Sequence, residues 1–221
     1  MIGVVLLGHG STDPRADVAL QELVATLQEE WWDAAISHAY LDHCQPTLEE
    51  AVDSLPSTVQ RIVIVPLLLS TAFHAKFDVP RLVAALDVQL PLCTTHPLGP
   101  DAELAADAVR DQQGPVVLAV SGTSDASAQA AFLNLATYLQ ALRREPAVIG
   151  YASMAVPHVP EAIVRSAAKA VVCFTLFPGV FSDRIARAAA EAGIPSTQPL
   201  WRQARVRTLI RERVEQALAL E

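Results

Sequence analysis

The stretch IGVVLLGHGSTDP, residues 2–14, combines an unbroken apolar run with a glycine-flanked histidine, His9. The apolar run does not alternate with polar residues, which is typical of a parallel strand buried on both faces of its sheet. The two glycines allow a sharp turn around His9, and the Asp-Pro pair at the end of the stretch is a helix-start signal. The stretch therefore predicts a strand, a turn and a helix.

Similar apolar runs, rich in Val, Ile and Leu, recur along the chain. The clearest are 62–69, 116–120 and 171–177, and weaker candidates are 36–41, 90–95 and 147–152. Between the opening run and the candidate at 36–41, Leu20, Leu23 and Leu27 follow the spacing of one helix face. Strands that alternate with helices predict an α/β fold, in which helices flank parallel sheets.

The opening stretch has a counterpart 112 residues later, because VVLLGHGSTD at 4–13 aligns with VVLAVSGTSD at 116–125. Farther along, residues 65–76 align with 173–184, an offset of 108 residues that pairs Leu68 with Leu176, Phe73 with Phe181 and Lys76 with Arg184. Any two α/β units share some apolar pattern, but here turn residues match as well. We expect two similar lobes, 1–112 and 113–221, with a cleft between them.

The two halves differ at their histidines. His9 aligns with Ser121, and His74 aligns with Ser182. Both histidines follow predicted strands, so both fall at the carboxyl edge of the sheet, where open α/β sheets bind ligands. A lone histidine is more often structural, but the loss of the same residue type at two positions indicates that His9 and His74 work together.

The motifs LLGHGS at 6–11, PLLL at 66–69 followed by His74, and DVP at 78–80 together resemble the sirohydrochlorin chelatases of the class II chelatase superfamily. The resemblance is close over the first half and extends over the second half as the degenerate repeat of the longer, two-lobed members. It implies that His9 and His74 bind an incoming divalent metal ion and are the catalytic residues. The implied reaction is insertion of Fe²⁺, or alternatively Co²⁺, into sirohydrochlorin during siroheme or cobalamin synthesis.

The family often carries Phe-Leu-Glu after its second strand, with the Glu supporting the metal site. Here the residues are Tyr40, Leu41 and Asp42. The resemblance implies that Asp42 is a third metal residue, although its side chain is shorter by one methylene. The neighbouring His43 is an alternative ligand.

The implied chemistry suits imidazole, which binds Fe²⁺ or Co²⁺ and exchanges more readily than a cage of thiolates. Histidine also accepts protons near neutral pH, and two pyrrole protons must leave the macrocycle. The substrate carries many carboxylates, for which Lys76, Arg184, Ser11 and Thr12 are the candidate binding residues. The alternative for Lys76 is an ordinary solvated surface residue.

Composition limits the other possibilities. The chain is 52% hydrophobic and 18% charged with a net charge of −8, which predicts a globular core and argues against nucleic-acid or anionic-membrane partners. Three cysteines without a C-x-x-C pair argue against a disulfide framework or a structural zinc site and favour the cytoplasm. The first apolar run lacks preceding basic residues and is read as a strand rather than a signal peptide. No phosphate-binding G-x-x-x-x-G-K-[ST] motif occurs, so no nucleotide cofactor is expected.

Two other functions fit parts of the pattern. A non-catalytic carrier of tetrapyrroles or divalent metal would use the same cleft and the same histidines. A histidine phosphatase is disfavoured, because those enzymes carry Arg before the histidine and Gly8 stands there. A monomer is expected, with a dimer as the alternative.

Overall fold

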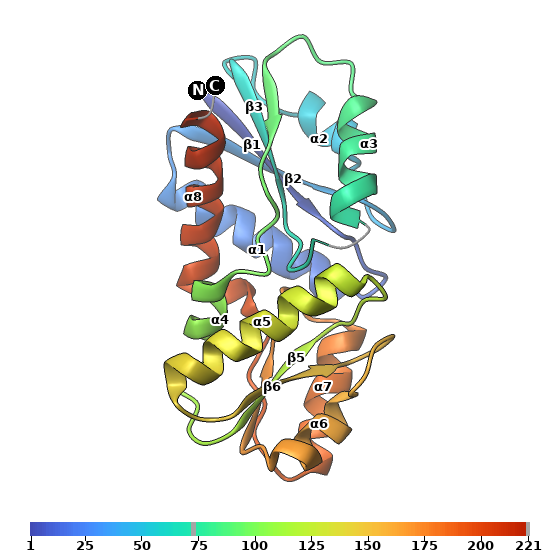
Figure 1. Cartoon of the computed structure of the whole chain (residues 1–221). Coiled ribbons are helices and arrows are strands. Elements are labelled where there is room, and N and C mark those ends of the chain that lie inside the picture. The colour runs from blue at the N-terminus through green and yellow to red at the C-terminus, as the bar shows by residue number, and fades with distance from the viewer. Residues whose placement is uncertain (72–73, 220–221) are drawn as a thin grey trace. The chain divides into compact units, whose positions relative to one another are not determined.

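The computed structural model describes residues 1–71 and 74–219, which form two compact α/β units (Figure 1). Unit 1 comprises Met1–Gly99 and Trp201–Glu221, and unit 2 comprises Pro100–Leu200. Phe73, matched with Phe181 in the repeat, lies outside the described residues. No helix in the described part of the chain is long and apolar enough to cross a membrane.

Unit 1 has a parallel sheet of four strands in the order β2-β1-β3-β4. The strands are β1 (Ile2–Gly8), β2 (Ala34–Tyr40), β3 (Arg61–Pro66) and β4 (Leu92–Thr94). The central strand β1 pairs with β2 on one side and β3 on the other, and its residues 4–7 are completely buried. Burial on both faces explains why the opening run is apolar without alternation.

Helices cover both faces of this sheet (Figure 1). They are α1 (Pro14–Glu30), α2 (Leu48–Asp53), α3 (Val79–Ala84) and α8 (Ala204–Ala219), and a π-helical turn, η1 (His74–Asp78), leads directly into α3. Helices α2 and α3 pack on the face that carries Val5 and Leu7, whereas α1 and α8 lie on the opposite face. This arrangement leaves the carboxyl ends of β1 and β3 free to carry the turns of the site.

Helix α1 begins as the sequence predicts. Asp13 is its N-cap and accepts a hydrogen bond from the Arg15 backbone N–H at 3.0 Å. The predicted helix face, Leu20, Leu23 and Leu27, is buried. The cap fixes where the chain leaves the His9 turn and becomes helical.

Unit 2 has a smaller parallel sheet in the order β6-β5-β7. Its strands are β5 (Val116–Val120), β6 (Ala147–Tyr151) and β7 (Ala170–Cys173), and its helices are α4 (Ala102–Val109), α5 (Ala126–Arg143), α6 (Val159–Ser166) and α7 (Val180–Glu191). A 3₁₀ turn, η2 (Leu200–Arg202), leads toward α8. Helices α6 and α7 share one core cluster with β5 and β7. The predicted α/β fold with two parallel sheets is therefore confirmed.

Two of the predicted strands end early. Strand β3 ends at Pro66 rather than at 69, and β7 ends at Cys173 rather than at 177. Leu67 and Phe174 remain buried beyond these ends. An apolar run marks burial, and here the burial continues into the turns that follow the strands.

The repeat in the sequence and the compact units in space have different boundaries. Helix α4 belongs to the first repeat but contacts α5 in unit 2, and α8 belongs to the second repeat but contacts β3 in unit 1. Four apolar residues of α8 are fully buried, namely Val206, Leu209, Ile210 and Val214. The lobes 1–112 and 113–221 stay a prediction about segments of sequence, because each unit is completed by the last helix of the other segment.

Candidate metal site

The turn that carries His9 is built on a close backbone contact. Gly10 has φ +92°, and a Cβ placed on it would lie 1.7 Å from the Asp42 carbonyl oxygen. The Leu41 N–H donates to the Gly8 carbonyl at 2.9 Å, and the Asp42 N–H donates to the His9 carbonyl at 3.1 Å. The loop after β2 therefore clamps the His9 turn, and only glycine fits at position 10.

Unit 2 repeats this backbone arrangement. Gly122 has φ +117°, and its Cβ would lie 2.0 Å from the Ser153 carbonyl oxygen. The Ala152 N–H donates to the Val120 carbonyl at 2.9 Å, as Leu41 does to Gly8. The turn thus forms with Ser121 where unit 1 has His9, so the backbone fold does not require the histidine.

His9 and His74, 65 residues apart in the chain, meet at this edge of unit 1. Their Nε2 atoms are 3.0 Å apart, and their rings are edge to face with centroids 4.3 Å apart and an interplanar angle of 84°. His9 follows β1, and His74 opens η1 after β3. The structure therefore brings together the two histidines that the repeat singled out.

Hydrogen bonds at the far side of each ring determine which nitrogens face one another. The Nδ1 atom of His9 lies 3.2 Å from the Gly10 carbonyl oxygen, and the Nδ1 atom of His74 lies 2.7 Å from Asp78 Oδ2. Because both partners are acceptors, each neutral ring carries its proton on Nδ1. Both Nε2 atoms then carry a lone pair, and their separation of 3.0 Å is favourable only when a cation, a proton or a metal ion, is shared between them.

The distance between the two Nε2 atoms suits a shared metal ion. Two nitrogens bound to one tetrahedral ion at about 2.0–2.1 Å are separated by roughly 3.3 Å. The observed separation of 3.0 Å is within a few tenths of an ångström of this value, and the edge-to-face rings would also have to turn so that both Nε2 atoms face the ion. Both histidines are solvent-exposed, so the remaining coordination positions are accessible to water or to a substrate.

The electrostatics of the site favour neutral imidazole. Although His9 is exposed, the protein atoms around its ring remove part of its hydration and so lower its pKa from the ordinary histidine value, and a positive charge on His74 would lower it further. The Gly10 hydrogen bond and the Asp42 charge oppose this effect. The pKa of His9 remains lowered, which keeps the Nε2 lone pair available near neutral pH.

Asp42 lies beside His9 through its backbone, but its carboxylate is directed elsewhere. Its Oδ1 accepts a hydrogen bond from the His43 N–H at 2.8 Å, and its Oδ2 is 3.5 Å from His43 Nε2. The Asp42 side chain is 69% exposed. Within residues 1–71 and 74–219, no three His, Cys, Asp or Glu side chains converge as a metal site. A metal role for Asp42 or His43 stays a prediction.

The residues predicted to bind substrate carboxylates are dispersed. Ser11 exchanges hydrogen bonds with Cys44, and its Oγ accepts from the Asp13 N–H at 3.1 Å. Thr12 is exposed in the same loop, and Lys76 is exposed on η1. Arg184 lies in unit 2 on α7, with its guanidinium 5.9 Å from the Phe181 ring centroid. Their carboxylate-binding roles remain predictions.

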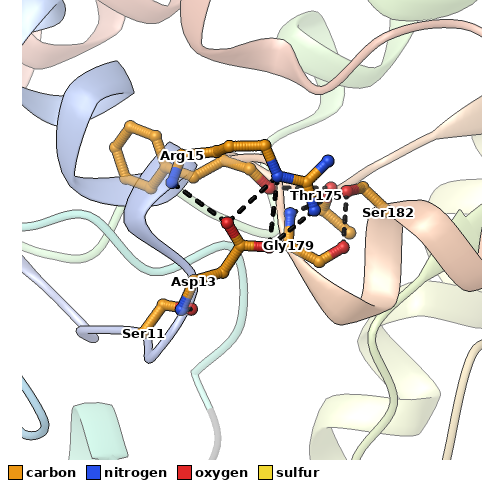
Figure 2. A network of polar contacts seen from close by, with 7 residues as sticks. Ser11, Asp13, Arg15, Thr175, Gly179 and Ser182 are labelled. Atoms are coloured by element: carbon orange, nitrogen blue, oxygen red, sulfur yellow. Dashed lines mark hydrogen bonds and ion pairs between the residues drawn. The ribbon is translucent and has the colours of Figure 1, made fainter.

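The serine that replaces His74 in the second half has a structural role. The Ser182 hydroxyl donates to the Gly179 carbonyl at 2.8 Å and accepts from the Gly179 N–H at 2.9 Å (Figure 2). Ser182 is buried at the start of α7. The Ser182 side chain therefore stabilises the start of α7, whereas the side chain of His74 is exposed.

Sequence reasoning did not assign a role to Asp78, although its motif was noted. Asp78 comes four residues after His74, at the other end of η1. That spacing, about one helical turn, is the signal that could have paired the carboxylate with the imidazole.

The fold and the facing imidazoles define a class of parallel α/β proteins with a pair of histidines at the carboxyl edge of the sheet. Comparison with known proteins gives the family. The profile of the CbiX family matches residues 3–112 and again residues 115–217. The chain therefore belongs to the CbiX family of sirohydrochlorin chelatases, and it contains the family unit twice.

Curated relatives correspond to about half of the chain. The sirohydrochlorin cobaltochelatase of Methanosarcina barkeri is 29% identical over 119 residues, which cover 49% of this chain and 91% of the relative. The sirohydrochlorin cobaltochelatase of Sulfurisphaera tokodaii is 32% identical over 107 residues, which cover 48% of this chain and 86% of the relative.

Solved structures share the fold over the whole length. SirB from Bacillus subtilis with Fe³⁺ superposes with a TM-score of 0.81 at 20% identity, covering 98% of this chain and 96% of SirB. A second structure is the sirohydrochlorin chelatase SirB from Bacillus subtilis subspecies spizizenii in complex with cobalt. It superposes with a TM-score of 0.78 at 20% identity, covering 98% of this chain and 95% of that SirB. At this identity the likeness shows the two-lobed fold.

Proposed function

We propose that this protein is a chelatase that inserts a divalent transition-metal ion into sirohydrochlorin, with His9 and His74 as the metal-binding and catalytic residues. The observation that carries the proposal is the pair of Nε2 atoms 3.0 Å apart, each in a ring whose Nδ1 faces an acceptor. Membership of the CbiX family and the names of the curated relatives support the substrate class.

The site would hold the metal substrate loosely. Two imidazoles leave most of the coordination positions of the ion open, so water ligands can be replaced by the nitrogens of the macrocycle one at a time. Imidazole binds Fe²⁺ and Co²⁺ but exchanges more readily than several thiolates would. A weak site is required, because the ion must leave both histidines for the ring.

The same two rings can accept the protons that the macrocycle loses. Insertion of one M²⁺ into the free-base ring releases two N–H protons. As the ion leaves, His9 and His74 each regain an Nε2 lone pair, and together they can accept two protons. The lowered pKa of His9 favours release of its proton to water near neutral pH.

The metal preference belongs to the same proposal. Sequence reasoning placed Fe²⁺ first and Co²⁺ second, whereas the curated relatives are named as cobaltochelatases. Two neutral imidazoles bind both ions, so the site itself does not discriminate strongly between them. We propose Co²⁺ as the first ion to test, with Fe²⁺ as its competitor.

The test is a multiple-turnover assay with sirohydrochlorin in excess over protein, under anaerobic conditions, with Co²⁺ or Fe²⁺. The visible spectrum changes when the free-base ring is metallated, which gives the rate directly. We expect His9→Ala and His74→Ala each to lower turnover by about 100-fold or more, because a ligand and a proton acceptor are lost together.

The matched control is Ser121→Ala, which changes the counterpart of His9 in unit 2 and should retain full turnover. A single stoichiometric event without further turnover would identify a non-catalytic carrier instead. Normal turnover by both histidine variants would refute the proposed site.

A further inference from the structure

The carboxylate of Asp78 contacts the Nδ1 side of the His74 ring. Its Oδ2 accepts the Nδ1–H of His74 at 2.7 Å, and its Oδ1 lies 3.4 Å from Nη2 of Arg81. The Asp78 side chain is 21% exposed, whereas Arg81 is 76% exposed. The half-buried carboxylate is therefore held from both sides, with its shorter contact on the imidazole.

We infer that Asp78 is a positioning residue that sets the tautomer and direction of His74 for metal binding. This inference rests on the proposed function. Because Asp78 accepts the Nδ1 proton, the Nε2 lone pair of His74 is left to face His9 and the metal ion. A carboxylate behind a metal-binding imidazole also restricts rotation of its ring.

The local structure argues against a role in helix stability alone. Asp78 occupies the N-cap position of α3, but its side chain makes no capping hydrogen bond to that helix. Its φ and ψ of −74° and −44° are helical. A carboxylate placed for the helix would bond the free N–H groups of the first turn, whereas this one bonds the imidazole.

The repeat supplies an independent observation. At the offset that pairs His74 with Ser182, Asp78 pairs with Ala186. The histidine and its carboxylate partner are therefore both missing from the second half. The backbone differs in the same place, because residues 74–78 form the π-helical turn η1 while their counterparts lie within the regular helix α7. Single π turns inside helices are frequent at functional sites.

The test compares full-length Asp78→Ala and Asp78→Asn with the wild type. Co²⁺ binding is followed by the visible absorption of the bound ion, and insertion kinetics are measured as a function of Co²⁺ concentration. We expect Asp78→Ala to weaken Co²⁺ binding and to raise KM for Co²⁺ by about 10–100-fold, with a much smaller change in kcat. Asp78→Asn keeps an acceptor oxygen without the charge, so its Co²⁺ affinity and its KM for Co²⁺ should lie between those of the wild type and Asp78→Ala.

The matched control is Asp107→Asn. Asp107 is 24% exposed and pairs with Arg110 three residues later, as Asp78 does with Arg81, but no ion pair within residues 1–71 and 74–219 joins it to a histidine. We expect this variant to bind Co²⁺ as the wild type does. An equal loss in Asp107→Asn would mean that the effect is general destabilisation, and the inference would be wrong.

A spectroscopic measurement tests the tautomer of His74 directly. Nitrogen-15 NMR of the metal-free wild type should show His74 protonated on Nδ1, and Asp78→Ala should shift the ring toward the Nε2–H tautomer. A wild-type His74 protonated on Nε2 alone would overturn the inference, as would unchanged Co²⁺ affinity in a folded Asp78→Ala. His9→Ala and His74→Ala distinguish failure of the proposed metal site from failure of the role of Asp78. If both histidine variants lose Co²⁺ binding while Asp78→Ala keeps it, only the role of Asp78 is wrong.

Discussion

At the scale of single residues, the site depends on a few atoms that a neighbouring loop holds in place. The His9 carbonyl and the Gly8 carbonyl are both bonded to the loop after β2, and Gly10 allows that loop to approach. The imidazoles then need only one acceptor each to fix their tautomers. The fold of the turn does not require the histidine, because the same turn forms in unit 2 with Ser121 at this position. The His9 side chain is therefore available for the proposed function.

Gly10→Ala should damage both stability and activity. The new Cβ would meet the Asp42 carbonyl at 1.7 Å, and the φ of +92° is unfavourable for alanine. Backbone strain of this kind costs about 1–3 kcal/mol, and relief of the clash must move the loop away from His9. Thermal unfolding and metal-insertion rates measure the two effects.

Gly122→Ala is the matched variant, because its Cβ would meet the Ser153 carbonyl at 2.0 Å with a φ of +117°. It should lose a similar amount of stability but keep its turnover per folded molecule. Equal losses of turnover in both variants would contradict the assignment of the site to unit 1.

Asp42→Ala should weaken metal delivery less than either histidine change. The carboxylate is 69% exposed and bonds the His43 N–H, so it acts on the ion through water or through its charge on His9. We expect an increase of about 10-fold in KM for the metal, near the lower end for residues that support a ligand. Rates identical to wild type at every metal concentration would remove Asp42 from the site, and a loss as large as that of His9→Ala would make it a direct ligand.

At the scale of elements, each site residue is positioned by a strand end and by the helix start that follows it. Strand β1 delivers His9, and α1 begins four residues later at Asp13 with Pro14 in its first turn. Strand β3 delivers the chain toward His74, and η1 leads into α3. His9 follows the end of β1 directly, and His74 comes eight residues after the end of β3, so the turns at one edge of the sheet bring residues 65 apart in the chain to 3.0 Å.

The cap of α1 should make stability depend on pH in acid. Hydrogen bonds from the Arg15 side chain and backbone lower the pKa of Asp13 to about 2 from 3.8 (Figure 2). A carboxyl with a depressed pKa stabilises the fold above its unfolded value and loses that contribution as pH falls from about 4 toward 2. Asp13→Asn should therefore lower Tm at pH 6 and differ less from wild type at pH 3.

The control for this cap is Arg15→Ala, which removes the ion pair but leaves the Asp13 carboxylate as N-cap. It should weaken the pH dependence only in part, since the backbone N–H of residue 15 still donates. Thermal unfolding curves recorded between pH 3 and pH 6 provide the comparison. A constant difference between Asp13→Asn and wild type across this range would contradict the lowered pKa.

At the scale of the whole molecule, the chain contains one family unit twice, but the repeats are not the compact units. Helix α8, from the end of the second repeat, completes unit 1, and α4, from the end of the first, belongs to unit 2. Because each unit contains a helix from the other repeat, neither unit is complete without both repeats. The exchange also means that one face of the sheet carrying the proposed metal site at its edge is covered by the last helix of the chain.

A chain of residues 1–112 alone should therefore not fold as a stable monomer. It would lack α8, whose buried residues Val206, Leu209 and Ile210 leave an apolar surface uncovered when they are removed. Exposed apolar surface of this kind leads to self-association or to partial unfolding. Sedimentation and thermal unfolding would detect both, and co-expression of residues 200–221 should restore a cooperative transition. A monomeric 1–112 with the Tm of the full chain would support independent lobes instead.

The sequence by itself determined the α/β class, the order of strands and helices, the repeat and the candidate histidine pair. These features depend on local patterns: apolar runs for buried strands, Asp-Pro for the start of α1, and glycines at the turns. The same patterns overestimated β3 and β7, because buried turn residues such as Leu67 and Phe174 are as apolar as strand residues.

Only the tertiary structure decided how the parts combine. It showed that the Nε2 atoms of His9 and His74 face each other, that Asp78 holds His74 from behind, and that the Asp42 carboxylate is directed toward His43. It also showed that α4 and α8 are exchanged between the units. The physical reason is common to all four: a side-chain direction or a packing partner is determined by contacts between residues far apart in the chain, and neither periodicity nor spacing records which of several chemically equivalent partners is nearest.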